Sequence, residues 1–228
     1  MSETFIHLEH VAKSYPGARE GESLRILQDV DVRIRRGSSV AIIGPSGSGK
    51  STLMSLIAGL DRPSEGRIKV LGQDLGQLSE SQLGQFRAQN LGIVFQQFHL
   101  IAHLTAEENV ALPLRILGAS AHEAAVSAQK ALADVGLEHR IDHVPSRLSG
   151  GECQRVAIAR AMITRPAGIL ADEPSGNLDV RTGEQVMGLL FELTKAHGIT
   201  LILVTHNEDL AKKCDERLML QAGRLEHG

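Results

Sequence analysis

The most informative segment of this sequence is Gly44-Pro45-Ser46-Gly47-Ser48-Gly49-Lys50-Ser51. It satisfies the pattern G-x-x-x-x-G-K-[ST], whose glycines let the backbone curl closely around a polyphosphate with N–H groups pointing inward. An apolar strand at residues 40–43 precedes it and a helix over about residues 50–60 follows it, which is the context that the pattern requires. The segment therefore predicts a phosphate loop rather than a plain glycine-rich turn.

Different side chains of the phosphate loop have different expected tasks. We expect Lys50 to reach the β- and γ-phosphates and the Ser51 hydroxyl to coordinate Mg²⁺, while the following helix adds the positive end of its dipole. The predicted nucleotide-binding residues of this segment are Gly44, Pro45, Ser46, Gly47, Ser48, Gly49, Lys50, Ser51 and Thr52. Taken alone, the loop is also compatible with a GTPase or a small-molecule kinase.

The bulk composition fits one large domain. The chain has 228 residues, of which 42% are hydrophobic and 22% charged, and its formal net charge is −3. This balance argues against a protein that coats nucleic acid. Two cysteines without CxxC or scaffold spacing predict a reducing, cytosolic compartment, and the ten histidines form no metal-ligand spacing.

No segment of the sequence is expected to enter a membrane. The start, Met1-Ser2-Glu3-Thr4, lacks the basic and apolar regions of a signal peptide. The longest apolar runs are strand-sized, as in Leu201-Ile202-Leu203-Val204, whereas a bilayer span needs about 20 apolar residues. Any membrane role is therefore expected to come through a partner.

The order of apolar and polar segments predicts an α/β fold. Residues 5–39 alternate apolar and polar side chains, which indicates an N-terminal antiparallel β subdomain, and residues 66–71 form a further strand. After Ser149 the sequence alternates between helices and apolar strands at residues 169–171 and 200–204, as in a mostly parallel sheet covered on both faces. We expect one domain over residues 1–228, with an inserted α-helical subdomain at about residues 97–165.

The middle of the chain, residues 78–145, is expected to be mostly helical. Capping boxes at Thr105 with Glu108 and at Ser120 with Glu123 predict two helix starts. Gly136 is a predicted helix stop. Pro113 is expected to kink or end the helix that begins at Thr105.

A second anion site is predicted at Leu148-Ser149-Gly150-Gly151-Glu152-Cys153-Gln154. Ser149 and Glu152 form a capping box for the helix that follows, and that alone would be a structural role. Glycines are poor helix formers, however, and two of them at the first positions expose backbone N–H groups at a positive helix end.

Two adjacent carboxylates end the apolar strand Ile169-Leu170-Ala171. In a chain with a phosphate loop, Asp172 is expected to hold Mg²⁺ through water and Glu173 to orient or deprotonate the attacking water. Without that loop, a surface acidic pair would be the preferred interpretation. His206 follows the strand at residues 200–204 and is expected at the same sheet edge.

These motifs together resemble those of the ABC ATPases along essentially the whole chain. The resemblance is carried by Leu148-Ser149-Gly150-Gly151 between the phosphate loop and Asp172-Glu173-Pro174, with Thr205-His206 further on. It implies that Tyr15 stacks on adenine, that Gln96 meets Mg²⁺ and the attacking water and reports to a membrane partner, that residues 175–179 form the D-loop across a dimer interface, and that His206 contacts the γ-phosphate.

The resemblance sorts the candidate site residues into three sets. The catalytic set is Glu173, His206 and Gln96. The metal set is Ser51, Gln96 and Asp172. Beyond the phosphate loop, the nucleotide-binding set contains Tyr15, Ser149, Gly150, Gly151, Glu152 and Asp179. ATP and Mg²⁺ are the implied ligands.

A closer resemblance is to the subgroup of the lipoprotein-release ATPase LolD, the MacB ATPase domain and YbbA. It is carried by Ala58-Gly59-Leu60-Asp61, by residues 104–114 and by residues 171–179, while residues 136–224 look most like YbbA. Cys153, Ser175 and Asn207 depart from the usual Gln, Thr and Asp, but no departure removes a group that the chemistry needs.

The resemblance implies that two copies of the chain sandwich two ATP molecules. The γ-phosphate would bridge Lys50 of one copy and Ser149 and Gly151 of the other. Closure would power a separate transmembrane permease docked near residues 95–104, with the chain peripheral on the cytoplasmic face of the inner membrane. An FtsE-like ATPase of the envelope or division machinery and the ATPase of a conventional importer are the alternatives. A translation or DNA-repair ATPase is disfavoured, because those usually carry two ATPase units or a long coiled coil.

Overall fold

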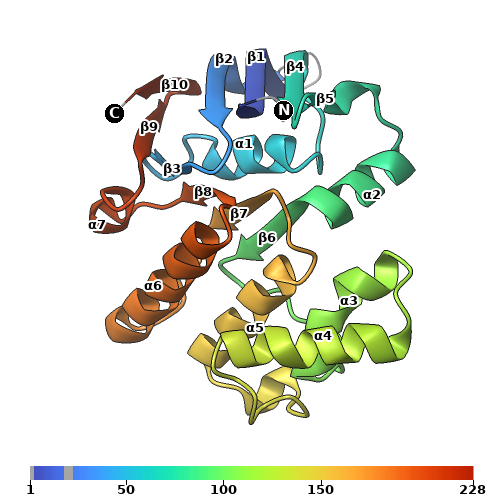
Figure 1. Ribbon diagram of the computed structural model, residues 1–228. Helices are drawn as coiled ribbons and strands as arrows, with labels where there is room; N and C mark the ends of the chain where they lie inside the picture. The colour runs from blue at the N-terminus through green and yellow to red at the C-terminus, as the bar shows by residue number, and fades with distance from the viewer. Residues whose placement is uncertain (1–2, 18–22, 228) are drawn as a thin grey trace. The chain divides into compact units, whose positions relative to one another are not determined.

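The computed structural model describes residues 3–17 and 23–227, which divide into two compact units (Figure 1). The first unit contains residues 1–84 and 200–228, and the second contains residues 85–199. Helix α2 (Glu80–Asn90) crosses the boundary between them.

A four-stranded antiparallel sheet forms one part of the first unit. Its order is β2 (Ser23–Arg35), β1 (Thr4–Pro16), β4 (Glu65–Val70) and β5 (Gln73–Asp74). Alternate residues of β2 are buried, because successive side chains point to opposite faces of a sheet with one face on the core. The sheet confirms the predicted antiparallel N-terminal subdomain.

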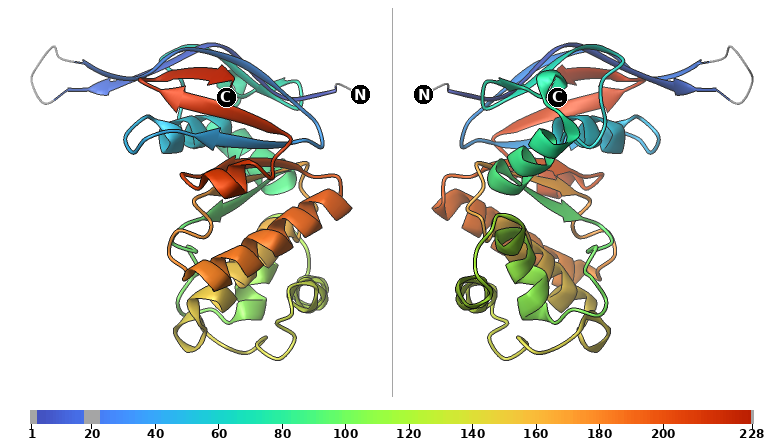
Figure 2. Two further views of the ribbon diagram at one scale, coloured as in Figure 1. Left: turned by 90° about the vertical axis from the view of Figure 1, so that its left-hand side faces the viewer. Right: turned by 90° about the vertical axis from the view of Figure 1, so that its right-hand side faces the viewer.

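The other part of the first unit is built on mostly parallel strands. β3 (Ser39–Ile43) pairs in parallel with β8 (Thr200–Val204) and β9 (Glu216–Gln221), and β10 (Arg224–His227) is antiparallel to β9. Helix α1 (Lys50–Ile57) contacts both β4 and β8 (Figure 2), and the short helix α7 (Glu208–Ala211) follows β8. The strands β9 and β10 were not predicted.

The second unit contains two parallel strands and four helices. β6 (Leu91–Phe95) pairs with β7 (Gly168–Asp172). The helices are α3 (Ala106–Ile116), α4 (Ala121–Asp134), α5 (Gly150–Met162) and α6 (Val180–Ala196). α5 contacts α3, α4, α6 and β6, and most of its side chains are buried, so it is the central element of this unit. Short 3₁₀ turns lie at Leu75–Gln77 and Pro145–Arg147.

Most helix-boundary predictions are confirmed. Both capping boxes are formed, with Thr105 capping α3 and Ser120 capping α4. Gly136 adopts φ 70° just after α4. Pro113, however, does not end α3, which continues to Ile116. Proline removes only its own N–H donor, and the Pro113 carbonyl still accepts a bond from the N–H of Leu117 at 3.1 Å.

The strand β6 at residues 91–95 was not predicted and lies inside the stretch that was expected to be mostly helical. The signal was present in Ile93, Val94 and Phe95, because β-branched and aromatic residues favour strands. Among the described residues, no helix is long and apolar enough to cross a membrane.

Candidate functional site

The phosphate loop connects β3 to α1 in the first unit. Gly49 occupies the N-cap position of α1 with φ 103°, a left-handed conformation that favours glycine. A Cβ atom added there would lie 3.0 Å from both Ile26 Cγ2 and Leu27 Cδ2. Backbone conformation and packing therefore both require glycine immediately before Lys50.

The polar groups of the phosphate loop have few side-chain partners in the protein itself. The N-cap Gly49 offers the first turn of α1 no side-chain acceptor. The Ser48 hydroxyl is buried and, in the described part of the chain, has no hydrogen-bond partner. The Lys50 ammonium group folds back and donates to the carbonyl oxygens of Gly44 at 2.8 Å and Pro45 at 2.9 Å. A polyphosphate fits a glycine-rich loop that leads into a helix start and carries one cation.

Tyr15 lies in the same unit and is held by its hydroxyl group. It donates to Asp61 Oδ2 at 2.8 Å, and the Lys13 ammonium group bonds Asp61 Oδ1 at 2.7 Å while lying 4.7 Å from the Tyr15 ring centre. Burial and the neighbouring Asp61 raise the pKa of Tyr15, an effect that a hydrogen bond with Thr52 opposes. Tyr15 as a whole is 37% exposed, and an aromatic ring that is partly exposed can stack on a planar ligand.

His206 completes the predicted residues of the first unit. It directly follows β8 and Thr205, and its side chain is exposed. Asn207, next to it, caps α7 by accepting bonds from Asp209 N–H and Leu210 N–H. The departure from aspartate at position 207 therefore preserves a capping oxygen.

The first turn of α5 in the second unit carries the predicted second anion site. Ser149 Oγ accepts from the Glu152 N–H at 3.3 Å, and Glu152 Oε2 accepts from the Ser149 N–H at 2.8 Å. Arg140 Nε donates to Glu152 Oε1 at 2.8 Å. The N–H groups of Gly150 and Gly151 remain at the helix start, where no intrahelical acceptor exists.

The charge of Glu152 is strongly stabilised in this arrangement. The hydrogen bond from the Ser149 backbone, followed by those from the Ser149 hydroxyl and Arg140, outweighs burial and lowers the pKa of Glu152 to about 2. Glu152 is therefore a carboxylate at neutral pH and accepts a hydrogen bond from the Ser149 N–H at the helix start. It is not itself a group that attracts phosphate.

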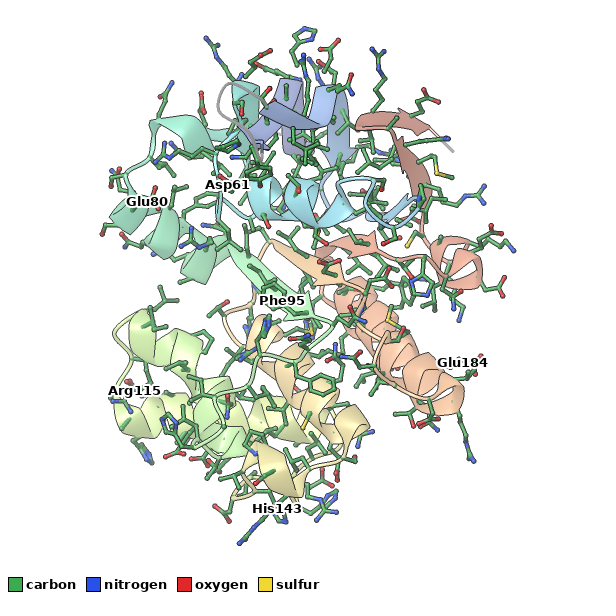
Figure 3. All side chains as sticks on the ribbon, turned by 180° about the vertical axis from the view of Figure 1, so that it is seen from behind. Asp61, Glu80, Phe95, Arg115, His143 and Glu184 are labelled. Carbon is green, nitrogen blue, oxygen red and sulfur yellow. The ribbon has the colours of Figure 1, made fainter. Side chains whose placement is uncertain are left out.

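The two acids and Gln96 lie at the carboxyl ends of the paired strands β6 and β7. Phe95, the last residue of β6 (Figure 3), pairs with Asp172, the last residue of β7, so Gln96 and Glu173 both follow directly. Glu173 adopts φ 46°, a strained conformation for a non-glycine residue, as is common at functional sites. The structure thus brings together the three residues expected to serve Mg²⁺ and water in this unit.

Asn177 joins the segment of Gln96 to the segment of Glu173. Gln96 Nε2 donates to Asn177 Oδ1 at 3.2 Å, and Asn177 Nδ2 donates to the Gln96 carbonyl at 3.0 Å. A Cβ atom at Gly176 would lie 2.7 Å from Gln96 Nε2, so only glycine allows this approach. Sequence reasoning placed Asn177 in the D-loop but did not assign it to the site.

Asp179 ends the D-loop as the N-cap of α6. Its carboxylate accepts from the Thr182 N–H at 3.1 Å. Hydrogen bonds from the Thr182 side chain and backbone lower the pKa of Asp179. Its structural role in this chain is therefore to start α6.

The metal set consists of oxygen donors only. Ser51 offers a hydroxyl, Asp172 a carboxylate and Gln96 an amide oxygen, while the Gln96 Nε2 atom bonds Asn177. Magnesium prefers such ligands and takes the rest of its shell from phosphate and water. Among the described residues, no cluster of three or more His, Cys, Asp or Glu side chains could hold a metal ion.

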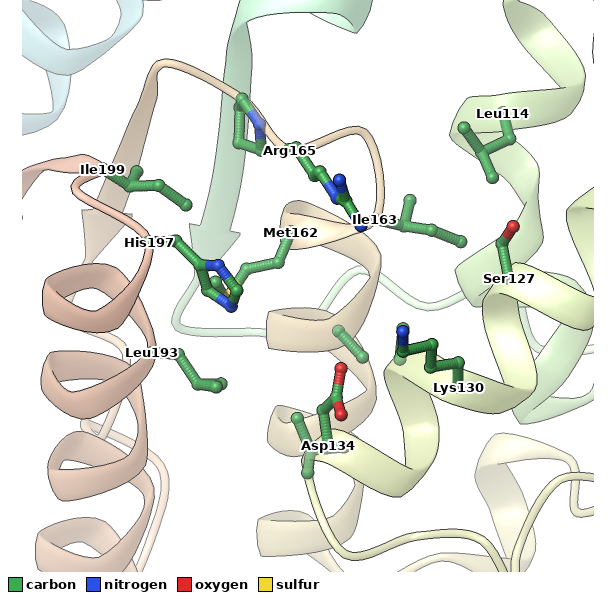
Figure 4. Close-up of a pocket in the computed structure, with 14 residues that line it drawn as sticks. Leu114, Ser127, Lys130, Asp134, Met162, Ile163, Arg165, Leu193, His197 and Ile199 are labelled. Atoms are coloured by element: carbon green, nitrogen blue, oxygen red, sulfur yellow. The ribbon is translucent and has the colours of Figure 1, made fainter.

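A pocket of about 390 Å³ in the second unit contains none of the predicted site residues. Lys130 and Asp134 of α4, Arg165 after α5 and His197 after α6 surround it (Figure 4), with Met162 among its apolar lining. A nucleotide site that a second copy completes would be open in a single chain. The absence of motif residues from this pocket therefore does not contradict their assignment to a nucleotide site.

Comparison with known proteins shows similarity to one family. The family model described as ABC transporter matches residues 27–176. The chain is 46% identical to the ABC transporter ATP-binding protein YbbA of Escherichia coli K12, covering 99% of this chain and 98% of YbbA. It is 48% identical to the lipoprotein-releasing system ATP-binding protein LolD of Nitratidesulfovibrio vulgaris, covering 96% of this chain and 93% of LolD.

Solved structures show the same similarity at the level of the fold. The dimeric ATP-binding cassette MJ0796 in a post-hydrolysis state with bound ADP and Pi has a TM-score of 0.88 and 39% sequence identity, covering 97% of this chain and 98% of the cassette. A second dimeric structure of MJ0796 has the same TM-score at 41% identity.

Proposed function

Because the chain belongs to the ABC transporter family as an ATP-binding subunit with ATPase activity, we propose that ATP closes two copies into a dimer that drives a separate membrane-embedded permease. The observation that carries this proposal is the occurrence of two glycine-rich helix starts in one chain, at the first turns of α1 and α5, each of which is a candidate anion site. A single nucleotide needs only one phosphate loop, whereas a dimer with shared sites uses both.

In the proposed reaction, the residues of the first unit bind and orient ATP. The Tyr15 ring stacks on adenine, and Lys50 exchanges its two carbonyl contacts for the β- and γ-phosphates. N–H groups of the phosphate loop surround the phosphate oxygens. His206 contacts the γ-phosphate and stabilises its charge as the bond to ADP breaks.

Residues of the second unit, together with Ser51 of the phosphate loop, act on water and metal in the proposed reaction. Ser51, Gln96 and Asp172 would hold Mg²⁺, which when bound neutralises part of the charge on the β- and γ-phosphates. Glu173 accepts a proton from the attacking water, whose oxygen bonds to the γ-phosphorus while the bond to ADP breaks, giving ADP and phosphate. The single domain over residues 1–228 thereby contributes one half of each of the two active sites in the dimer.

In the dimer, Ser149, Gly150 and Gly151 of one copy face the ATP held by Lys50 of the other. The N–H groups of the two glycines supply positive partial charge without a competing side chain. Asp179 lies in the D-loop, which we place at the interface between the copies. The dimer would close when ATP binds and open after hydrolysis, and this movement would drive the permease.

We assign the chain to the cytoplasmic face of the inner membrane, as a peripheral subunit of a lipoprotein-release or MacB-type complex. The high identity to YbbA and LolD over nearly whole chains supports this choice. No nucleic acid is expected as a partner, given the net charge of −3. The test is a pull-down from native membranes with Glu173→Gln and ATP. A partner with few spans and a large extracytoplasmic domain supports this assignment, a many-helix permease indicates an importer, and division proteins indicate an FtsE-like role.

The catalytic proposal is tested with the same variant. Glu173→Gln should lose ATP hydrolysis by about 10²-fold or more while ATP still drives dimerisation, because the amide cannot accept the proton. Turnover is followed by phosphate release and dimerisation by light scattering. A variant that hydrolyses ATP at the wild-type rate would show that Glu173 is not the base. Wild-type specific activity should also rise with protein concentration, and a flat dependence would argue against shared sites.

A further inference from the structure

The turn that follows β6, residues 95–99 and called the Gln96 turn below, has a strained backbone. Phe98 adopts φ 54° and His99 adopts φ 46°, and neither is a glycine. The His99 N–H bonds the Gln97 carbonyl, which tightens the turn further. Left-handed conformations at consecutive non-glycine residues persist only where surrounding contacts enforce them.

Arg160 of α5 supplies such a contact. Its Nη2 atom donates to the Phe98 carbonyl at 2.8 Å, and its Nη1 atom donates to the His99 carbonyl at 2.6 Å. The two acceptors belong to the two strained residues. A planar guanidinium presents two fixed donors, so it can fix the spacing and direction of adjacent carbonyl groups in a way that a flexible ammonium cannot.

A second α5 residue holds the other side of Gln96. Gln154 is fully buried, and its Nε2 atom donates to the Phe95 carbonyl at 3.3 Å. Its Oε1 atom is buried without a partner among the described residues, which costs free energy of folding. Side chains of α5 thus bond carbonyl groups on both sides of Gln96, while Asn177 bonds Gln96 itself.

The same helix begins at Ser149, the candidate anion site, and packs against α3, α4, α6 and β6. We expect a short helix that is packed on several sides to move as a unit. A displacement of its first turn is therefore transmitted to Gln154 and Arg160, and through them to the Gln96 turn.

We propose that Arg160 is a positioning residue, which holds the carbonyls of Phe98 and His99 so that the Gln96 amide keeps the orientation needed for Mg²⁺ and water. Through α5, Arg160 also links that orientation to the Ser149 end of the helix. The proposal rests on the proposed function of Gln96. Arg160 itself touches neither nucleotide nor metal. Its loss should act only through Gln96.

The experiment compares Arg160→Met, Arg160→Lys and the matched control Arg115→Met, an exposed arginine on α3 (Figure 3). In hydrogen exchange without nucleotide, Arg160→Met should raise the exchange of amides at residues 97–101 about tenfold, because the turn loses both tethers. Arg160→Lys should lie between wild type and Arg160→Met, and Arg115→Met should match wild type. This measurement does not depend on ATPase activity.

The functional arm is a double-mutant cycle with Gln96→Ala. Arg160→Met should raise the Mg²⁺ concentration for half-maximal ATP hydrolysis about tenfold, as for other residues that orient a metal ligand. ATP binding measured in EDTA should change less than about twofold. On the Gln96→Ala background, the effect of Arg160→Met on the Mg²⁺ requirement should disappear, because both changes act on one interaction.

Some outcomes would overturn the proposal. Unchanged exchange at residues 97–101 would show that Arg160 does not hold the turn. Independent, multiplicative effects of Arg160→Met and Gln96→Ala would show a general structural role instead. If Arg160→Met does not fold, Arg160→Lys carries the same cycle. A wild type without ATPase activity, together with a positive exchange result, would refute the proposed function but leave the tether intact.

Discussion

The helices α1 and α5 both begin with glycine-rich sequence at candidate anion sites, yet they start in opposite ways. α1 follows Gly49, which offers no side chain to its first turn, and the nearest charge is the cation Lys50. α5 follows Ser149 in a complete capping box with Glu152. The first helix start has no side-chain cap, whereas the second is capped by the protein's own side chains.

This difference separates a binding site from a docking surface. An uncapped helix start has N–H groups in need of an acceptor, so a phosphate gains the full benefit of the dipole there. At α5 the carboxylate of Glu152 already uses the Ser149 N–H and hydroxyl, which leaves chiefly the glycine N–H groups for a ligand. We infer that α1 binds ATP alone and that α5 contacts ATP only after α1 has bound it.

The largest expected effect tests the uncapped helix start. Lys50→Ala should lower ATP hydrolysis by at least about 10²-fold, because it removes the only cation of the phosphate loop. ATP binding is measured by equilibrium dialysis. The control is Lys130→Ala, an exposed lysine on α4, which should retain wild-type binding. If Lys50→Ala bound ATP as tightly as the wild type does, the inferred distinction would be lost, namely that α1 binds ATP alone and α5 only afterwards.

A smaller effect tests the capped helix start through its pH dependence. The pKa of Glu152 is about 2, below its ordinary value of 4.5, so the carboxylate contributes stability that is present above about pH 4.5 and is lost as pH falls toward 2. Glu152→Gln should lower the free energy of unfolding by up to about 3 kcal/mol at pH 7. The difference between variant and wild type should shrink below pH 4.5 in urea titrations. A pH-independent difference would show that charge is not the cause.

The smallest expected effect compares two capping boxes of the same design. Ser149→Ala and Ser120→Ala should each lower the free energy of unfolding by about 1 kcal/mol, since each removes one N-cap oxygen. Only Ser149→Ala should also lower ATP hydrolysis, because α4 starts away from any candidate site residue in sequence. Thermal unfolding and phosphate release are measured for both. Equal activities would mean that the Ser149 hydroxyl acts only as a cap.

Short-range patterns account for what the sequence could predict. The phosphate loop, the capping boxes and the acids after β7 are each defined by neighbouring residues, so their local geometry follows from turn and cap chemistry. The strand β6 was missed because its five residues lie between helices, and short apolar runs are ambiguous in periodicity.

The contacts around Gln96 could not be predicted for a different reason. Asn177 and Arg160 lie 81 and at least 61 positions away from the atoms they bond, and nothing in the local sequence reveals which carbonyl an arginine will meet. Only the pairing of β6 with β7 and the packing of α5 create these neighbours. Long-range polar contacts are therefore the part of a site that a sequence motif leaves undefined.

The left-handed backbone at Glu173 has a consequence for how this protein can evolve. Glycine would relieve the strain at this position, whereas the acid is needed for the proposed chemistry. Folding and turnover thus favour different amino acids at one codon, a local trade-off between stability and activity. Selection for thermal stability alone would favour glycine at position 173 and so a protein that binds ATP without hydrolysing it. Only selection for ATP turnover keeps glutamate there.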